Sequence, residues 1–324
     1  MKLTAWILLA LFPFFTLLSG CNRGQTNGGV KPTFGGRKLE VLYPHKGTMP
    51  IKATCTTGMV ADVVGKIGGP LVQIERMMGE GSDPHTHTVT SADLGMMNRA
   101  EVIFYSGLHL EGKMIETLER EGKKKPVFPV TEYLSPSSIL TDEHDHPDPH
   151  VWFDVARWSE VAQVIGNALA LYDPTNAATY KKNTEAYRAE LAKLHDEAKT
   201  KLATIPKENR ALITSHDAFR YFGRAYDIEV KGIQGISTDT EASLREINEL
   251  VDFIVARKVK AVFVESSVNE RNMESLRQGC KSRGQPVALG GTLFSDAMGK
   301  DGTPEGTYIG MIRHNVETIT KALK

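Results

Sequence analysis

Short runs of β-branched and aromatic residues alternate with helical patterns over most of this 324-residue chain, and this alternation limits the folds open to it. Such alternation is typical of parallel β-sheets with helices packed on their faces. The pattern therefore predicts an α/β fold. In the first half, the predicted strands cover residues 51–57, 71–77, 102–105 and 127–130, and the predicted helices cover residues 59–67, 91–98 and 111–121.

The alternation stops once, where two helical segments follow each other without a strand between them. The first segment covers residues 155–171. Asp173 and Pro174 then supply an N-cap and a first-turn proline for a second helix that continues to about Ala203. A helix of about 30 residues is about 45 Å long, at 1.5 Å per residue. We therefore interpret this helix as a rigid connection between two lobes.

The alternation resumes after residue 206 and continues to the end of the chain. Thr238 and Glu241 have the spacing of a capping box, which predicts a helix that begins at Ala242. The predicted strands cover residues 211–214, 228–231, 261–265 and 287–289, the predicted helices cover 218–226, 242–257 and 270–281, and a closing helix ends near Leu323. We predict two lobes, each a small parallel β-sheet flanked by helices: an N-terminal lobe at 38–172, a connecting helix at 173–205 and a C-terminal lobe at 206–324.

The first 20 residues have the features of a secretory signal peptide. Lys2 gives a positive start, and the apolar run at residues 5–18 is short for a membrane span, since a spanning helix needs roughly 20 apolar residues. The run ends in Leu18-Ser19-Gly20-Cys21, which resembles the lipobox of bacterial lipoproteins, in which the cysteine is acylated. An ordinary signal peptide with a coincidental cysteine is the alternative.

Residues 21–37 are rich in Gly, Asn and Thr and predict a flexible tether. We therefore expect the mature protein outside the cytoplasm, held by lipid on Cys21 at the periplasmic or cell-surface side of a bacterial membrane. More than one acyl chain gives a stable anchor.

The charges of the chain balance, with 39 Lys and Arg residues against 39 Asp and Glu residues. Nucleic-acid-binding proteins normally carry a basic patch and a high pI, so this balance argues against nucleic acid as a partner. Beyond Cys21, the cysteines are Cys55, in a predicted strand, and Cys280, at the end of a predicted helix in the other half. We expect two quiet, unpaired thiols rather than a disulfide.

Four side chains that can bind a metal follow predicted strands: His85, His150, His216 and Asp296. In parallel α/β sheets, ligands collect beyond the carboxyl ends of the strands. Two of the four residues come from each half, so they can meet only in a cleft between the lobes. Three imidazoles and one carboxylate suit a zinc-like ion in fourfold coordination.

Structural explanations are also open for residues in these positions. His85 shares its loop with His87, and either could be a solvated surface histidine. Asp296 could cap a turn. Asp217, directly after His216, is expected to cap the helix that follows.

Several motifs of the chain resemble those of the TroA-type family, the metal-binding receptors of bacterial ABC transporters for zinc and manganese. They follow the family's order from about residue 50 to the C-terminus. The motifs are DPH at 83–85, AEVIFYSGLHLE at 100–111, DPHVWFD at 148–154, TSHDAF at 214–219, VKGIQGIST at 230–238, VFVESS at 262–267 and LFSDAMG at 293–299. The resemblance implies two lobes bridged by a long rigid helix, with metal held between them. It carries the family's four ligands over to His85, His150, His216 and Asp296.

The resemblance also implies a function, that of a monomeric receptor rather than an enzyme. Such a receptor captures Zn²⁺ and delivers it to an ABC permease and its ATPase for import. Manganese receptors of the family often have a glutamate at the position of His216, and a third imidazole favours zinc. Family members with three histidines and one aspartate that accept both metals are known, so Mn²⁺ is the alternative cargo. The His144–His146 segment is much shorter than the His-rich loop of many zinc receptors, and we interpret it as a solvated polar loop.

Two other functions fit parts of the sequence. A zinc hydrolase needs an open metal position and a general base. Glu265 is the one candidate base, although a structural role suits it better, and the chain has no HExxH motif. A surface adhesin is a role proposed for relatives, but the chain has no repeats or low-complexity region.

For the receptor, we expect that movement of His216 and Asp296, both in the C-terminal half, opens the site for release.

Overall fold

The computed structural model describes residues 33–34, 37–41 and 44–324, which belong to one compact unit. The predicted signal peptide, Cys21 and most of the predicted tether lie outside the described residues. At the end of the tether, β1 (Thr33–Phe34) pairs antiparallel with β2 (Arg37–Lys38). Within the described ranges, no helix combines the length and the apolar character needed to cross a membrane.

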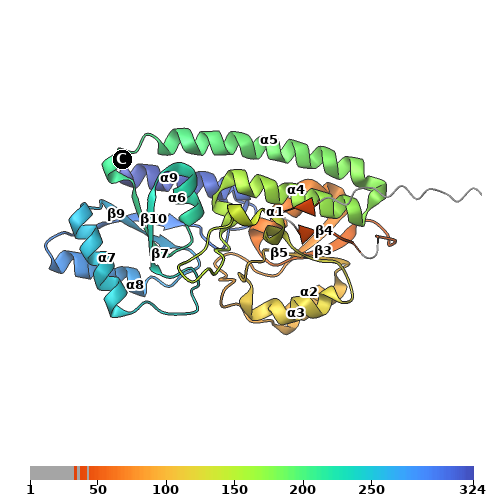
Figure 1. Ribbon diagram of the computed structural model, residues 1–324, viewed down its shortest axis with the longest axis horizontal. Helices are drawn as coiled ribbons and strands as arrows, with labels where there is room; N and C mark the ends of the chain where they lie inside the picture. The colour runs from red at the N-terminus through yellow and green to blue at the C-terminus, as the bar shows by residue number, and fades with distance from the viewer. Residues whose placement is uncertain (1–32, 35–36, 42–43) are drawn as a thin grey trace, which may run out of the picture. The chain divides into compact units, whose positions relative to one another are not determined.

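The N-terminal half contains a four-stranded parallel sheet with the strand order β4-β3-β5-β6. Its strands are β3 (Ile51–Cys55), β4 (Val72–Arg76), β5 (Val102–Tyr105) and β6 (Val127–Pro129). The helices between these strands are α1 (Gly58–Gly68), α2 (Ser91–Arg99) and α3 (Ile115–Gly122). Figure 1 shows α1 on one side of the sheet and α2 and α3 on the other. The parallel α/β arrangement predicted from the alternation is confirmed.

Local sequence explains where α1 begins and ends. The Thr57 hydroxyl caps its first turn by accepting a hydrogen bond from the backbone N–H of Val60. The helix ends at Gly69, whose φ of 53° favours glycine. Apolar side chains recur at helical spacing, so one face of α1 is buried in the main apolar core.

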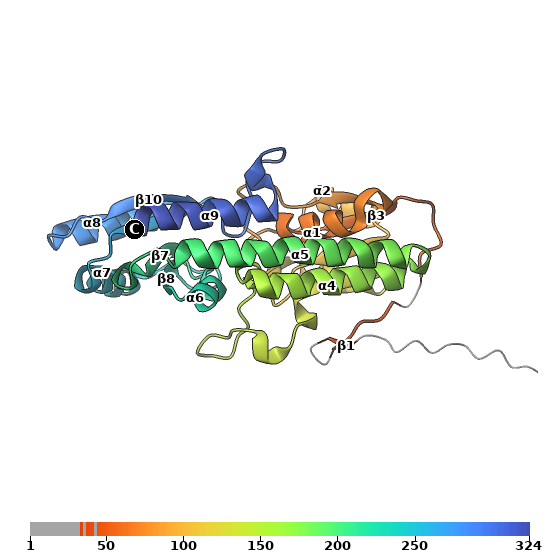
Figure 2. The same ribbon diagram turned by 90° about the horizontal axis from the view of Figure 1, so that it is seen from above.

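Two long helices, α4 (Val155–Tyr172) and α5 (Ala177–Leu202), follow without a strand between them. α5 has 26 residues and is therefore about 39 Å long. Figures 1 and 2 show α5 running past the strands of both halves, with α4 on one side and α1 and α9 (Tyr308–Leu323) on the other. The long connecting helix expected from the sequence is present.

The C-terminal half has four strands in two parallel pairs. β7 (Ala211–His216) pairs with β8 (Glu229–Gln234), and β9 (Ala261–Glu265) pairs with β10 (Ala288–Leu293). β7 also lies beside β9. The remaining helices of this half are α6 (Arg220–Tyr226), α7 (Leu244–Arg257) and α8 (Arg271–Ser282).

The two faces of these strands enter different apolar clusters. Ile213 and Val262 pack with α7 and α8 in a cluster confined to the C-terminal half. Leu212 and Phe263 point the other way, into a core that also contains residues of α5, of α9 and of the N-terminal half. Because side chains alternate along a strand, β7 and β9 join both cores.

The capping box of α7 lies at different residues from those predicted. Ser243 accepts a hydrogen bond from the backbone N–H of Glu246, whose carboxylate accepts one from the backbone N–H of Ser243. The predicted pair, Thr238 and Glu241, has the same spacing, but the Thr238 hydroxyl donates to Asp83 in the N-terminal half. The prediction was wrong because a contact distant in sequence occupies the capping hydroxyl.

Asp217 does not cap α6, contrary to expectation. The helix begins at Arg220, and no described side chain caps it. The carboxylate of Asp217 lies 3.7 Å from the Arg220 guanidinium instead. Cys55 and Cys280 are buried free thiols among the described residues, as expected.

Candidate metal centre

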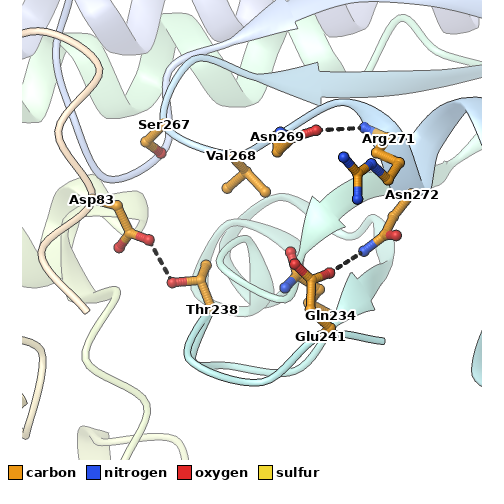
Figure 3. A pocket seen from close by; sticks show the side chains of 9 residues that line it. All are labelled: Asp83, Gln234, Thr238, Glu241, Ser267, Val268, Asn269, Arg271 and Asn272. Atoms are coloured by element: carbon orange, nitrogen blue, oxygen red, sulfur yellow. Dashed lines mark hydrogen bonds between the residues drawn. The ribbon is translucent and has the colours of Figure 1, made fainter. Parts of the chain in front are cut away.

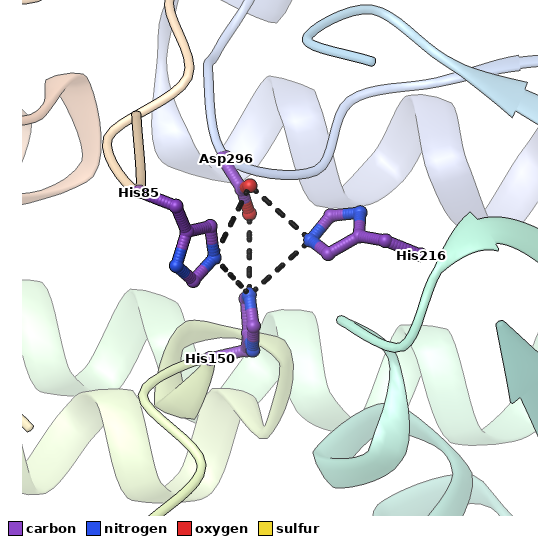
Figure 4. A group of neighbouring side chains, drawn as sticks. All are labelled: His85, His150, His216 and Asp296. Atoms are coloured by element: carbon purple, nitrogen blue, oxygen red, sulfur yellow. Dashed lines mark hydrogen bonds and ion pairs between the residues drawn. The ribbon is translucent and has the colours of Figure 1, made fainter. Parts of the chain in front are cut away.

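The four side chains predicted to bind a metal come together in one cluster (Figure 4). His85 lies in the loop between β4 and α2, and His150 lies just before the 3₁₀ turn Val151–Phe153 that precedes α4. His216 is the last residue of β7, and Asp296 follows β10. Figure 4 shows all four side chains pointing toward a common centre, two from each half of the chain.

The distances between the candidate ligand atoms match those of a tetrahedral site. The Nε2 atom of His150 lies 3.3 Å from the Nε2 atoms of both His85 and His216. The carboxylate oxygens of Asp296 lie 3.7, 3.5 and 3.2 Å from the Nε2 atoms of His85, His150 and His216. A tetrahedron with metal–ligand bonds of about 2.0–2.1 Å has edges of about 3.3–3.4 Å. The cluster can therefore accept one ion of this kind with little rearrangement.

The cluster is shielded from solvent. His150 and His216 have no exposed surface, and His85 and Asp296 are only 4% and 2% exposed. Both carboxylate oxygens of Asp296 are buried and lie 3.2–3.7 Å from the Nε2 atoms of the three imidazoles. Because a buried carboxylate is unfavourable without a compensating positive charge, this arrangement favours a cation-binding site over an ordinary part of the core.

Buried carboxylates orient two of the imidazoles. The Nδ1 atom of His150 lies 2.8 Å from Oδ1 of Asp148. The Nδ1 atom of His216 lies 2.5 Å from Oε2 of Glu265, whose other oxygen accepts a hydrogen bond from the His216 backbone N–H at 2.8 Å. A carboxylate at Nδ1 fixes the ring and directs the Nε2 lone pair toward a metal.

The His85 loop is organised by Asp83. One carboxylate oxygen of Asp83 accepts a hydrogen bond from the His85 backbone N–H at 2.9 Å. The other accepts hydrogen bonds from the hydroxyls of Thr86, at 3.0 Å, and Thr238, at 2.6 Å. Thr238 belongs to the loop between β8 and α7, so Asp83 connects the His85 loop to the other half of the chain.

The segment that carries Asp296 is fastened to the N-terminal half on both sides. The indole N–H of Trp152 donates to the backbone oxygen of Ser295 at 3.0 Å. The Arg76 guanidinium donates to both carboxylate oxygens of Asp301 at 2.8 Å. Asp296 therefore follows a strand of the C-terminal half, and the segment around it also contacts the N-terminal half.

The carboxylates change the acidity of two of the imidazoles. Burial alone would lower the pKa of His150, but Asp148 and Asp296 raise it to about 9. Burial would also lower the pKa of His216, but Glu265 and Asp296 raise it well above its usual range. Without a metal, His150 and His216 therefore retain protons at neutral pH.

The pKa values of the other two members shift in the opposite direction. Burial is the strongest influence on His85 and lowers its pKa to about 4, so this imidazole is neutral. Burial would raise the pKa of Asp296, but His216 and His150 hold it well below its usual range. Metal ligands must be deprotonated, so an entering dication has to displace the protons on His150 and His216.

Other histidines considered in the sequence lie outside the cluster. The Nε2 atom of His87 lies 3.0 Å from Oδ2 of Asp93, next to the start of α2. His144 and His146 are exposed, and the Nδ1 atom of His146 lies 3.0 Å from Asp142. This segment is the solvated polar loop that its sequence predicts.

The residues that support the cluster were only partly visible in the sequence. Asp148 was missed, although an aspartate two residues before a proline-preceded histidine is a local signal that could have found it. Glu265 was expected to have a structural role, and its contact with His216 supplies one. Arg76 and Trp152 carry no such signal, because their partners are more than a hundred residues away.

The arrangement is suited to holding an ion rather than to chemistry on a bound water. Four protein ligands complete a tetrahedral sphere, whereas catalytic zinc sites keep a position open. Glu265, the candidate base of the hydrolase hypothesis, is engaged with His216.

Comparisons with known proteins point in the same direction. The sequence model of one family, zinc-uptake complex component A periplasmic, matches residues 54–322. The manganese-binding lipoprotein MntA of Bacillus subtilis (strain 168) is 42% identical over 275 residues, which cover 85% of this chain and 90% of that protein. The zinc-binding protein TroA of Treponema pallidum (strain Nichols) is 44% identical over 268 residues, covering 83% and 87%. The solved structure of periplasmic TroA from Treponema pallidum matches with a TM-score of 0.83 at 43% identity, covering 86% of this chain and 99% of that chain.

Proposed function

The chain belongs to the zinc-uptake complex component A family, and from this premise we propose that it is an extracytoplasmic receptor that captures Zn²⁺ for import. Members of this family are solute-binding receptors of ABC transporters and not enzymes. The observation that carries the proposal is the buried cluster of His85, His150, His216 and Asp296, which we propose holds the ion. Four protein ligands retain an ion until the protein itself moves.

Zinc is the proposed cargo because of the donor set. Three imidazole nitrogens and one carboxylate suit Zn²⁺, whereas Mn²⁺ prefers more oxygen ligands. The Irving–Williams order also gives zinc the higher affinity at a given site of this kind. Manganese becomes the better candidate if Asp296 binds through both oxygens and raises the coordination number. The relatives do not decide between the metals, since one is named for manganese and another for zinc.

A receptor of this family works with a membrane permease and its ATPase. We propose that this chain delivers its ion to such a pair as a monomer. We also propose that lipid on Cys21 anchors it to the membrane, which agrees with the lipoprotein name of its relative MntA. The tether at 21–37 would let the folded part reach the permease.

The alternative functions are weaker. A hydrolase is set aside because the family consists of receptors and because Glu265 supports His216. An adhesin would act through an exposed surface, which gives no reason for a buried cluster of three histidines and an aspartate.

Competition titration of the metal-free protein with Zn²⁺ and Mn²⁺ tests the proposal. We expect one tightly bound Zn²⁺ per chain and much weaker binding of Mn²⁺. The substitution His216→Glu exchanges an imidazole for a harder carboxylate, so it should lower the ratio of zinc to manganese affinity by about tenfold or more.

The matched control is His87→Ala, which removes an imidazole close in sequence to His85 but outside the cluster. It should leave both affinities unchanged. A wild-type preference for manganese would change the cargo but keep the receptor. If neither ion binds at one per chain, the receptor proposal is wrong.

A further inference from the structure

The loop at residues 235–243, between β8 and α7, touches the N-terminal half at two neighbouring residues. We name it the mouth loop. The Thr238 hydroxyl donates to Asp83 at 2.6 Å. Beside it, Oδ1 of Asp239 lies 3.2 Å from Nζ of Lys113. The first of these contacts takes the hydroxyl that the sequence predicted would cap a helix.

A polar cavity of about 230 Å³ lies at the contact between Thr238 and Asp83 (Figure 3). Its lining includes the carboxylates of Asp83 and Glu241 and one guanidinium, that of Arg271. A cavity needs about 10–15 Å³ of such space to hold one water molecule, so several fit here. Such a space can accommodate a hydrated divalent cation.

The lining of this cavity is linked directly to the proposed metal site. Asp83 accepts a hydrogen bond from the backbone N–H of His85. Gln234 is the partner of His216 in the pairing of β8 with β7. The cavity therefore borders the supports of one ligand from each half.

A further link leads to Asp296, the carboxylate ligand. Ser267 lines the cavity, and its hydroxyl lies 2.9 Å from that of Ser295, the residue before Asp296. Three of the four proposed ligands thus have a neighbour in the cavity wall. His85 is also the most exposed of the four, at 4%.

We propose that this cavity is the passage by which a hydrated divalent cation enters and leaves the metal site, and that the Thr238–Asp83 hydrogen bond closes it. This inference rests on the proposed function. Asp83 both receives the closing bond and holds the backbone of His85. Breaking the bond frees the mouth loop and loosens the His85 loop at the same time, so opening is coupled to the weakening of one ligand.

The test uses stopped-flow kinetics of Zn²⁺ binding and of Zn²⁺ release to a chelator, with the purified protein. Thr238→Val removes the hydroxyl and keeps the size of the side chain. Because the lost bond is to a charged group, release should accelerate by about tenfold. Association should accelerate as well, since the same gate controls entry. The looser His85 loop should add to the release rate alone, so the dissociation constant should rise by less than the release rate does.

Two substitutions serve as controls. Thr238→Ser retains the hydroxyl and should restore the wild-type rates. Thr240→Val changes an exposed threonine of the same loop and should leave both rates unchanged. If Thr238 merely helped Asp83 to position His85, Thr238→Val would speed release without speeding association. That result would contradict the proposal that Thr238 closes the passage.

Lys113→Gln provides a second, independent variant if Thr238→Val does not fold. It removes only the ion pair with Asp239, and both side chains of that pair are partly exposed. Both rates should rise by about two- to threefold at low salt, and the difference from the wild type should shrink at high salt. If Thr238→Val binds and releases Zn²⁺ at the wild-type rates, the proposed gate is wrong. If Thr238→Val does not fold, the same result with Lys113→Gln leads to that conclusion. Failure of the wild type to bind one Zn²⁺ overturns the proposed function instead.

Discussion

At the scale of single residues, His150 and His216 each lie between two carboxylates. Asp148 and Glu265 contact their Nδ1 atoms, and Asp296 faces their Nε2 atoms. The same carboxylates that would make these imidazoles strong metal ligands also make them hold protons more tightly. Protons and metal ions therefore compete for the same nitrogens.

This competition predicts that zinc affinity rises with pH. The pKa of His150 in the metal-free protein is raised to about 9, and that of His216 is raised well above its usual range. At pH 7 both protons must leave when the ion binds, so about two protons should be released per ion. Affinity should increase between pH 6 and pH 8, as measured by competition with a chelator.

Calorimetry gives an independent measure of the released protons. Titrations at pH 7 in buffers with different ionisation enthalpies should give different binding enthalpies, and their slope is the number of protons released. Asp148→Asn removes one of the charges that raise the pKa of His150, so it should reduce that number. A slope of zero for the wild type would contradict the assigned protonation.

The four candidate ligands could be predicted from the sequence more readily than the residues that contact them. His85, His150, His216 and Asp296 could be found because each is of a ligand type and follows a predicted strand. Thr238 was misassigned as a helix cap, since the local spacing contains no information about Asp83, 155 residues away. Contacts distant in sequence are where sequence reasoning failed.

At the scale of elements, the close packing of α4 against α5 keeps the connecting helix in place. Gly166 of α4 faces Thr184 of α5, and a Cβ atom at position 166 would collide with the Thr184 side chain. The Thr184 hydroxyl donates to the backbone oxygen of Tyr180 within α5, at 2.7 Å. The absence of a side chain at Gly166 thus sets how closely the helices approach.

Gly166→Ala should therefore destabilise the protein, although alanine is the better helix former. Overpacking of this kind costs about 1–3 kcal/mol in the free energy of unfolding, measured by denaturant titration. Gly112→Ala is the matched control, because no described atom lies within 4 Å of a Cβ added there. An equal stability of the two variants would show that α4 and α5 can move apart without loss.

The elements were predicted well as individual segments but less well as pairs. α5 and the eight strands β3–β10 lie close to their predicted positions, because hydrophobic period and turn residues are local signals. The pairing of β7–β10 into two separate ladders has no such signal. Hydrogen bonding between strands depends on how the helices pack against them, and the sequence pattern does not contain that information.

At the scale of the whole described structure, the apolar core and the four-residue cluster are two of the features that join the halves. The main apolar core contains residues from both, among them Phe104, Trp152 and Phe263. The cluster of His85, His150, His216 and Asp296 adds a second junction, with two residues from each half. Because one core extends across the junction, the described residues should unfold in a single transition.

Zinc should move this whole transition to higher temperature, because a folded state that binds an ion gains stability that the unfolded chain lacks. At a free Zn²⁺ concentration about 100 times the dissociation constant, the gain is about 2.7 kcal/mol. For a chain of this size that corresponds to a rise in Tm of roughly 4–5 °C, measured by calorimetry and reversed by a chelator. His150→Ala should abolish the rise, whereas His87→Ala should preserve it. Two transitions, only one of which responds to zinc, would mean that the ion binds within one half and does not join the two.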